Sequence, residues 1–169
     1  MELITNNLDI IATIPAGLYS GSSLYQSQVE WPSLEKFSTD QHWSYFQGMF
    51  NQNLLQQVLT TLPAGIAALG ESYYCQKANK QLWLTAGCIF IGILPYTYLF
   101  MGPTIRKMLS TEANTPQGDY VLFEQPALIK KTLLERYKQM HLVRTVASIV
   151  GFSLVVYGLS KRQENIILL

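Results

Sequence analysis

The chain has 169 residues, of which 49% are apolar and only 14% are charged, and its formal net charge is +1. An average soluble domain carries about 25% charged residues, so this composition favours a membrane protein. The mean hydropathy of +0.13 implies that some of its helices carry polar faces. The near-neutral charge, with no basic run interleaved with aromatic residues, argues against nucleic acid as a partner.

Neither the N-terminus nor the cysteines indicate a cellular compartment. The opening residues, MELITNNLDIIATI, lack the positive n-region of a signal peptide and the arginine-rich pattern of a transit peptide. Cys75 and Cys88 are the only cysteines, and Cys88 lies inside an apolar segment. We therefore expect no disulfide.

Four segments follow a helical period, and we expect helices at about residues 8–34, 42–69, 79–109 and 127–160. The first is centred on LDIIATIPAGLY, and the second on LLQQVLTTLPAGIAALG. The third is the most apolar, because Leu82–Gly102 is a run of 21 residues without a charge. At a rise of about 1.5 Å per residue, such a run crosses the ~30 Å hydrocarbon core of a bilayer. The fourth is centred on VASIVGFSLVVYGL.

A single domain, residues 1–169, folded as an integral membrane four-helix bundle, is the economical interpretation of these segments. The third segment contains Pro95, Tyr96 and Tyr98, which are tolerated at depth where neighbouring helices face them. The other three segments are less apolar, as expected of helices that turn polar groups toward a bundle interior.

Alternating helices divide the loops between two faces. One face carries Lys77, Lys80, Lys161 and Arg162, whereas the other carries Lys36 together with a longer series of cations: Arg106, Lys107, Lys130, Lys131, Arg136 and Lys138. The positive-inside rule favours the second face as cytoplasmic, with both termini outside or lumenal.

Three segments carry a polar or aromatic stripe at helical spacing. The stripes are Tyr19, Ser23, Gln26 and Glu30; Phe46, Phe50, Asn53, Gln57 and Thr60; and Tyr137, His141, Arg144 and Ser148. Facing lipid would be costly for such stripes, so we expect them to face one another. We predict that Glu30, His141 and Arg144 form one cluster in a cavity that opens on the more positive face. Tyr19, Gln26, Asn53, Gln57 and Tyr137 are the predicted ligand-binding residues.

Structural explanations compete with this prediction. Glu30 and Arg144 could be an ion pair that holds two helices in register, and His141 could be a hydrogen-bonded packing residue. Arg106 and Lys107 fit interface anchors. No P-loop, GxGxxG, HExxH, CxxC or GxSxG pattern occurs, and a zinc site would need more ligands than these. A haem held by His42 and His141 is geometrically conceivable, but no other residue pattern indicates haem binding. An ion channel is disfavoured, because the sequence has no filter-like loop.

Three short motifs resemble one known family. They are AGLYSGSSLYQSQVEWP in the first helix, GPTIRKML at the end of the third, and LLERYKQMHLVRT at the start of the fourth. Together they are similar to the anthrone oxygenase-like membrane proteins, which are small four-helix proteins, and the resemblance runs from about residue 10 to residue 159. The family often has Asn after the Pro-Thr pair and Trp before the His–Arg segment, where this chain has Ile105 and Tyr137.

The resemblance implies oxygenation of an anthrone-type aromatic ketone without a metal or another cofactor. His141 or Glu30 would be the general base, and Arg144 would stabilise the enolate oxygen. The competing interpretation is a non-catalytic membrane protein, either a small-molecule binder or an accessory subunit of a larger membrane complex, with Gly17 and Gly21 as a contact face. Expected partners are membrane lipid, a hydrophobic small molecule or such a complex.

Overall fold

A computed structural model describes residues 7–75, 77–110 and 126–167, and its elements are all helical. The first helix consists of α2 (Leu8–Tyr25), the π-helical turn η1 (Gln26–Glu30) and α3 (Trp31–Leu34). The second is α4 (Thr39–Tyr74). The third joins α5 (Lys77–Tyr96), η2 (Thr97–Met101) and α6 (Gly102–Leu109), and the fourth is α7 (Pro126–Ile167). The expected all-α fold of four helices is confirmed, although α4 and α7 run further than predicted.

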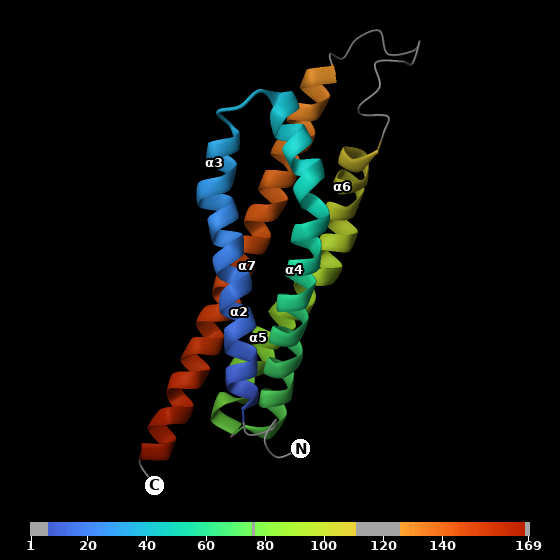
Figure 1. Ribbon diagram of the computed structural model, residues 1–169. Helices are drawn as coiled ribbons and strands as arrows, with labels where there is room; N and C mark the ends of the chain where they lie inside the picture. Colours follow the sequence, from blue (N-terminus) through green and yellow to red (C-terminus); the bar gives the residue numbers. More distant parts are fainter. Residues whose placement is uncertain (1–6, 76, 111–125, 168–169) are drawn as a thin grey trace.

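The helices alternate in direction and lie side by side (Figure 1). The start of α2 and the end of α7 lie at one end of the bundle, and the α3–α4 connection lies at the other. A capping box sets the start of α4: Ser38 Oγ accepts from the Gln41 backbone N–H, and the Ser38 N–H donates to Gln41 Oε1 at 3.1 Å. These bonds give partners to two backbone N–H groups, those of Ser38 and Gln41, which would otherwise lack an intrahelical acceptor at the start of the helix.

Two of the helical segments, Asn79–Leu109 and Ala127–Lys161, are long and apolar enough to cross a membrane. Large apolar side chains are also exposed on other helices, among them Leu18 on α2 and Leu59 on α4, which are 60% and 62% exposed. Exposed apolar surface of this extent is unusual in a soluble monomer. These observations suggest a membrane protein.

The buried apolar residues form two clusters, one toward each end of the bundle. The cluster toward the chain ends packs small residues around Trp83 and Phe90, and the cluster toward the α3–α4 connection is rich in aromatic and methionine side chains, including Trp31, Phe46 and Tyr137. On α4 and α7 the polar residues Gln57 and Arg144 lie between the segments that supply these clusters. Gln57 and Arg144 therefore lie in a polar region midway along the bundle, between the two apolar clusters.

Helices α4 and α5 approach closely at two glycines. A Cβ added at Gly65 would lie 2.7 Å from Ile91 Cδ1, and one added at Gly87 would lie 2.7 Å from Leu69 Cγ and 3.0 Å from the Leu69 backbone nitrogen. The contact at Gly87 includes backbone, which cannot move aside as a flexible side chain can. Glycine at this position thus sets the distance between the two helices.

We expect Gly87→Ala to destabilise the bundle by about 1–3 kcal/mol, because the added methyl group overpacks the α4–α5 contact. Thermal unfolding in detergent measures the change. Gly92→Ala is the matched control: it lies on the same helix with nothing within 4 Å of the added Cβ, and should be neutral or stabilising by up to about 1 kcal/mol. Equal melting temperatures for both variants would show that the contact is not tight.

Candidate functional site

Two π-helical turns flank the central polar region, and each precedes a proline by two residues. In η1 the Trp31 N–H bonds to the Gln26 carbonyl, and in η2 the Gly102 N–H bonds to the Thr97 carbonyl, five residues back in each case. Pro32 and Pro103 then follow in the first turns of α3 and α6. A proline has no N–H and its ring clashes with the carbonyl four residues earlier, so a wider preceding turn relieves the conflict.

His141 is held by two hydroxyl groups. Its Nδ1 lies 3.2 Å from Ser27 Oγ, on η1, and 3.2 Å from Thr145 Oγ1, one turn further along α7. The two hydroxyls are 2.8 Å apart, and Thr145 Oγ1 is also within 3.3 Å of the Ser23 carbonyl. His141 is 1% exposed, and its Nε2 is buried without a hydrogen-bond partner. The network orients the ring through Nδ1 and leaves Nε2 available.

Arg144 lies one turn beyond His141 on α7 and is 2% exposed. Its Nη1 donates to Gln57 Oε1 on α4 at 2.9 Å, whereas Nε and Nη2 are buried without a partner. Among the described residues the ion pairs within 4.0 Å are Lys130–Asp40 and Lys138–Glu35, so no carboxylate neutralises this guanidinium. A buried cation is costly unless it is paired, and one with open N–H groups is suited to bind an oxygen atom of a ligand.

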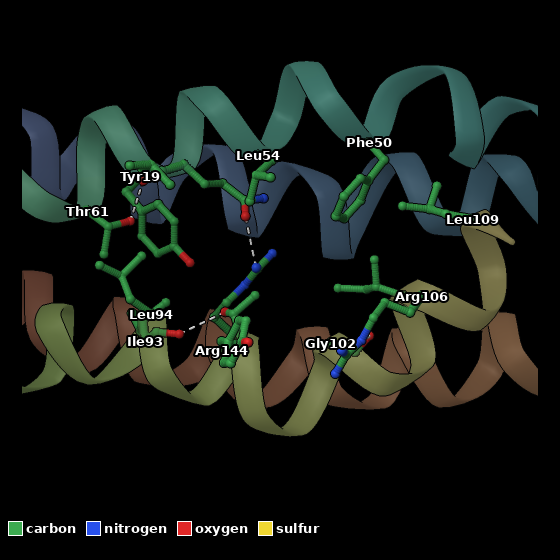
Figure 2. A pocket seen from close by; sticks show the side chains of 15 residues that line it. Tyr19, Phe50, Leu54, Thr61, Ile93, Leu94, Gly102, Arg106, Leu109 and Arg144 are labelled. Carbon is green, nitrogen blue, oxygen red and sulfur yellow. Dashed lines mark hydrogen bonds between the residues drawn. The ribbon is translucent and has the colours of Figure 1, made fainter.

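A cavity of about 340 Å³ lies beside Arg144 (Figure 2). It runs between α4 on one side and α5, η2 and α6 on the other. Its polar end carries Tyr19, Gln57, Thr61 and Arg144, and the remaining lining is mostly apolar. Figure 2 shows Tyr19 and Arg144 pointing into the same space, and the Tyr19 hydroxyl is buried without a hydrogen-bond partner. An apolar slot with a few converging polar groups is the usual form of a small-molecule site.

The opening of the cavity is on the flank of the bundle. The lining residues Leu54, Tyr98 and Leu109 are 41%, 72% and 40% exposed, and they lie on α4, η2 and α6. The sequence predicts an opening on the more positive face, and the lining includes Arg106, one of the cations of that face, in the last turn of α6. Across this opening the lining residues of α4 face those of η2 and α6.

The structure brings together most, but not all, of the predicted residues. Tyr19, Gln26, Tyr137, His141 and Arg144 are buried, and Gln57 contacts Arg144. Asn53 and Tyr137 line a small extension beside Arg144, and Gln26 and Asn53 both contact the Met49 sulfur. His141 is not part of the cavity lining.

Glu30 has a different partner from the one predicted. Its carboxylate accepts a hydrogen bond from the Tyr45 hydroxyl at 2.5 Å and lies more than 4.0 Å from the Arg144 guanidinium. The predicted stripe assumed an unbroken α-helix, whereas η1 adds a residue to the turn. Trp31, which is 2% exposed, therefore takes the inward place after Gln26.

Sequence reasoning missed Ser27, Thr61 and Thr145. Thr61 lies one turn after Gln57, whose carbonyl accepts its hydroxyl at 2.6 Å. Thr145 and Ser27 complete the hydrogen bonds of His141. Thr145 is four residues after His141, so helical spacing alone could have placed it beside the ring. No group of three or more His, Cys, Asp or Glu residues in the described ranges is placed to hold a metal ion.

Comparisons with known proteins give one consistent result. A family model described as anthrone oxygenase matches residues 46–154, more than half of the chain. The chain is 24% identical over 156 residues to anthrone oxygenase AgnL2 of Paecilomyces divaricatus, covering 87% of this chain and 92% of that protein. It is 22% identical over 115 residues to an anthrone oxygenase of Claviceps purpurea (strain 20.1), covering 68% of this chain and 65% of that protein. No solved structure matches.

We expect Arg144→Met to raise stability by about 1–4 kcal/mol, because methionine removes a buried, unneutralised charge and keeps most of the side-chain volume. Thermal unfolding in detergent measures this gain. Arg136→Met, at an exposed position of the same helix, should change stability by less than about 0.5 kcal/mol. A strong loss of stability in Arg144→Met would mean that this arginine is structural.

Proposed function

The chain belongs to the anthrone oxygenase family, and from this premise we propose that it is a cofactor-independent oxygenase of a hydrophobic aromatic ketone. Membership confirms the family resemblance, and the second and third motifs lie within the matched residues 46–154. The two relatives share only 22% and 24% of their aligned residues with this chain, and the match to the Claviceps protein spans 65% of that protein's length. The family is therefore established by these matches, whereas the reaction catalysed by this chain is our proposal.

The observation that carries the proposal is the buried Arg144 guanidinium with its open N–H groups at the polar end of the cavity. Removing a proton from the carbon opposite the ketone of an anthrone gives an aromatic enolate, whose negative charge rests on the former ketone oxygen. Preorganised donors aimed at such an oxygen stabilise the charge as it develops. Arg144 supplies these donors, and Tyr19 can add a hydroxyl donor from α2.

His141 is the base that the arrangement favours. Its Nε2 has no partner, whereas the Glu30 carboxylate already accepts from Tyr45. His141 does not line the cavity, so the proton must reach it after a small rotation of the ring or through one water molecule, both of which are compatible with general base catalysis. The Ser27 and Thr145 hydroxyls hold the ring from the other nitrogen.

The substrate itself supplies every electron in the proposed reaction. The enolate transfers an electron to dioxygen, and the resulting carbon radical and superoxide combine to form a carbon–oxygen bond. The product is a peroxide anion, which takes the proton back from the base and becomes a hydroperoxide. The hydroperoxide then loses its remaining C–H hydrogen and its terminal OH as water, which gives a second carbonyl. Overall, a CH₂ group and O₂ become C=O and H₂O, so the chain needs only to remove a proton and stabilise the enolate.

The cavity also bears on the competing interpretation. An accessory subunit would be expected to fill its interior with side chains, whereas this bundle leaves about 340 Å³ beside unpaired polar groups. Of the two glycines considered as a contact face, Gly17 packs against Phe152 of α7 and only Gly21 has nothing near its Cβ position. The cavity thus supports a small-molecule site better than an accessory subunit, and we propose that the site is catalytic.

Oxygen uptake with an anthrone tests the proposal directly. We expect Arg144→Met to lower kcat by about 10²–10³-fold through loss of oxyanion stabilisation, and His141→Ala to lower it by about 10²–10⁴-fold through loss of the base. Arg136→Gln is the control, because Arg136 is exposed on α7 and is not among the residues that line the cavity or its extension. If the wild-type protein consumed oxygen no faster than a sample without protein, the proposed activity would be contradicted.

We further propose that all four helices span a membrane, with the loop before α4 on the cytoplasmic side. The cations of that face and the two apolar helices support this arrangement. In a Cys75→Ser, Cys88→Ser background, a cysteine at Asn79 should react with an impermeant maleimide from outside. One at Phe37, which is exposed and spares the Ser38 cap, should react only after permeabilisation. Labelling of both from the same side would contradict the topology.

A further inference from the structure

The lining of the main cavity carries two arginines, Arg106 and Arg144, and no acidic residue. Neither arginine takes part in the ion pairs found in the described ranges, which involve Lys130 and Lys138. The rest of the lining is neutral and mostly apolar. Because nothing in the site offsets two positive charges, a ligand that brings negative charge is favoured over a neutral one of the same shape.

The two guanidinium groups lie at different depths. Arg144 is 2% exposed and contacts Gln57, whereas Arg106 is exposed on α6, across the slot from Phe50 in Figure 2. Arg106 lies opposite Phe50, and Arg144 contacts Gln57. Phe50 and Gln57 are seven residues apart on α4, which corresponds to about 10 Å along the helix axis at 1.5 Å per residue. Between them the slot is lined by apolar side chains such as Leu54 and Ile105.

The environments of the two arginines suit different charges. At Arg144 a permanent anion would have to lose its water, whereas an oxygen that becomes negative only during the reaction avoids that cost in the ground state. At Arg106 a permanent anion keeps part of its hydration, because Arg106 is exposed in the last turn of α6, at the end of the apolar segment Asn79–Leu109. The Arg106 Nε contacts the Gly102 carbonyl at 3.4 Å, and its terminal amino groups remain as donors at the mouth.

We propose that the substrate is an aromatic ketone carrying a carboxylate on the part of its ring system that lies away from Arg144, and that Arg106 binds this carboxylate at the mouth of the cavity. The inference rests on the proposed function for the identity of the reacting ketone. Arg106 is then a specificity-determining residue, since it distinguishes a substrate with a carboxylate from a neutral analogue.

Binding of two stable oxidised analogues tests the inference without turnover. The pair is anthraquinone-2-carboxylate and its neutral counterpart 2-(hydroxymethyl)anthraquinone, titrated calorimetrically into the full-length protein in detergent. We expect the wild type to bind the carboxylate at least about tenfold more tightly, as one charge-assisted bond provides. Arg106→Gln should abolish that preference, and Arg106→Lys should keep part of it, since lysine retains the charge without the planar fork.

Lys107→Gln is the matched control, because Lys107 is the neighbouring exposed cation and does not line the cavity. It should keep the wild-type preference. Equal binding of the two analogues by the wild type would overturn the inference. So would an Arg106→Gln variant that binds both analogues more weakly by the same factor, which is the result expected if Arg106 anchors a lipid phosphate. An Arg106-dependent preference supports the inference whether or not the protein consumes oxygen.

Discussion

The buried guanidinium of Arg144 is the constraint on which the rest of the site depends. Removing a cation from water costs several kcal/mol even after relaxation, and here one hydrogen bond to Gln57 is the partner found for it. The packed clusters on either side must offset this cost for the chain to fold. A charge retained at such expense, beside open space and without a carboxylate, is a recognised mark of a ligand-binding or catalytic site.

Two prolines shape the surroundings of that charge. Pro32 and Pro103 each follow a π-helical turn, and each turn changes which side chains face inward. Ser27, near the start of η1, lies beside His141. At η2, Thr97 and Tyr98 line the slot beside α4. The short motifs that carry the family resemblance include both prolines: the first motif contains η1, and the second begins directly after η2.

Helical spacing predicted a large part of the interior. The stripes containing Tyr19, Gln26, His141 and Arg144 do face inward, because a stripe of polar residues is stable in an apolar environment only when it is turned away from lipid. Glu30 makes no direct ion pair with Arg144 and accepts a hydrogen bond from Tyr45, so its place in the cluster stays a prediction. A fixed rotation per residue no longer holds across η1, and the position of every later side chain in that helix shifts with it.

The sequence by itself determined four helices, their approximate bounds and the polar face of each, because hydrophobic periodicity is a local property of the chain. Only the tertiary structure decided which polar groups meet. The bond from Arg144 to Gln57 joins α7 to α4, and the contact of His141 with Ser27 joins α7 to η1. The cavity lies between α4 on one side and α5, η2 and α6 on the other, so its existence depends on how separate helices pack, which no local pattern in the sequence specifies.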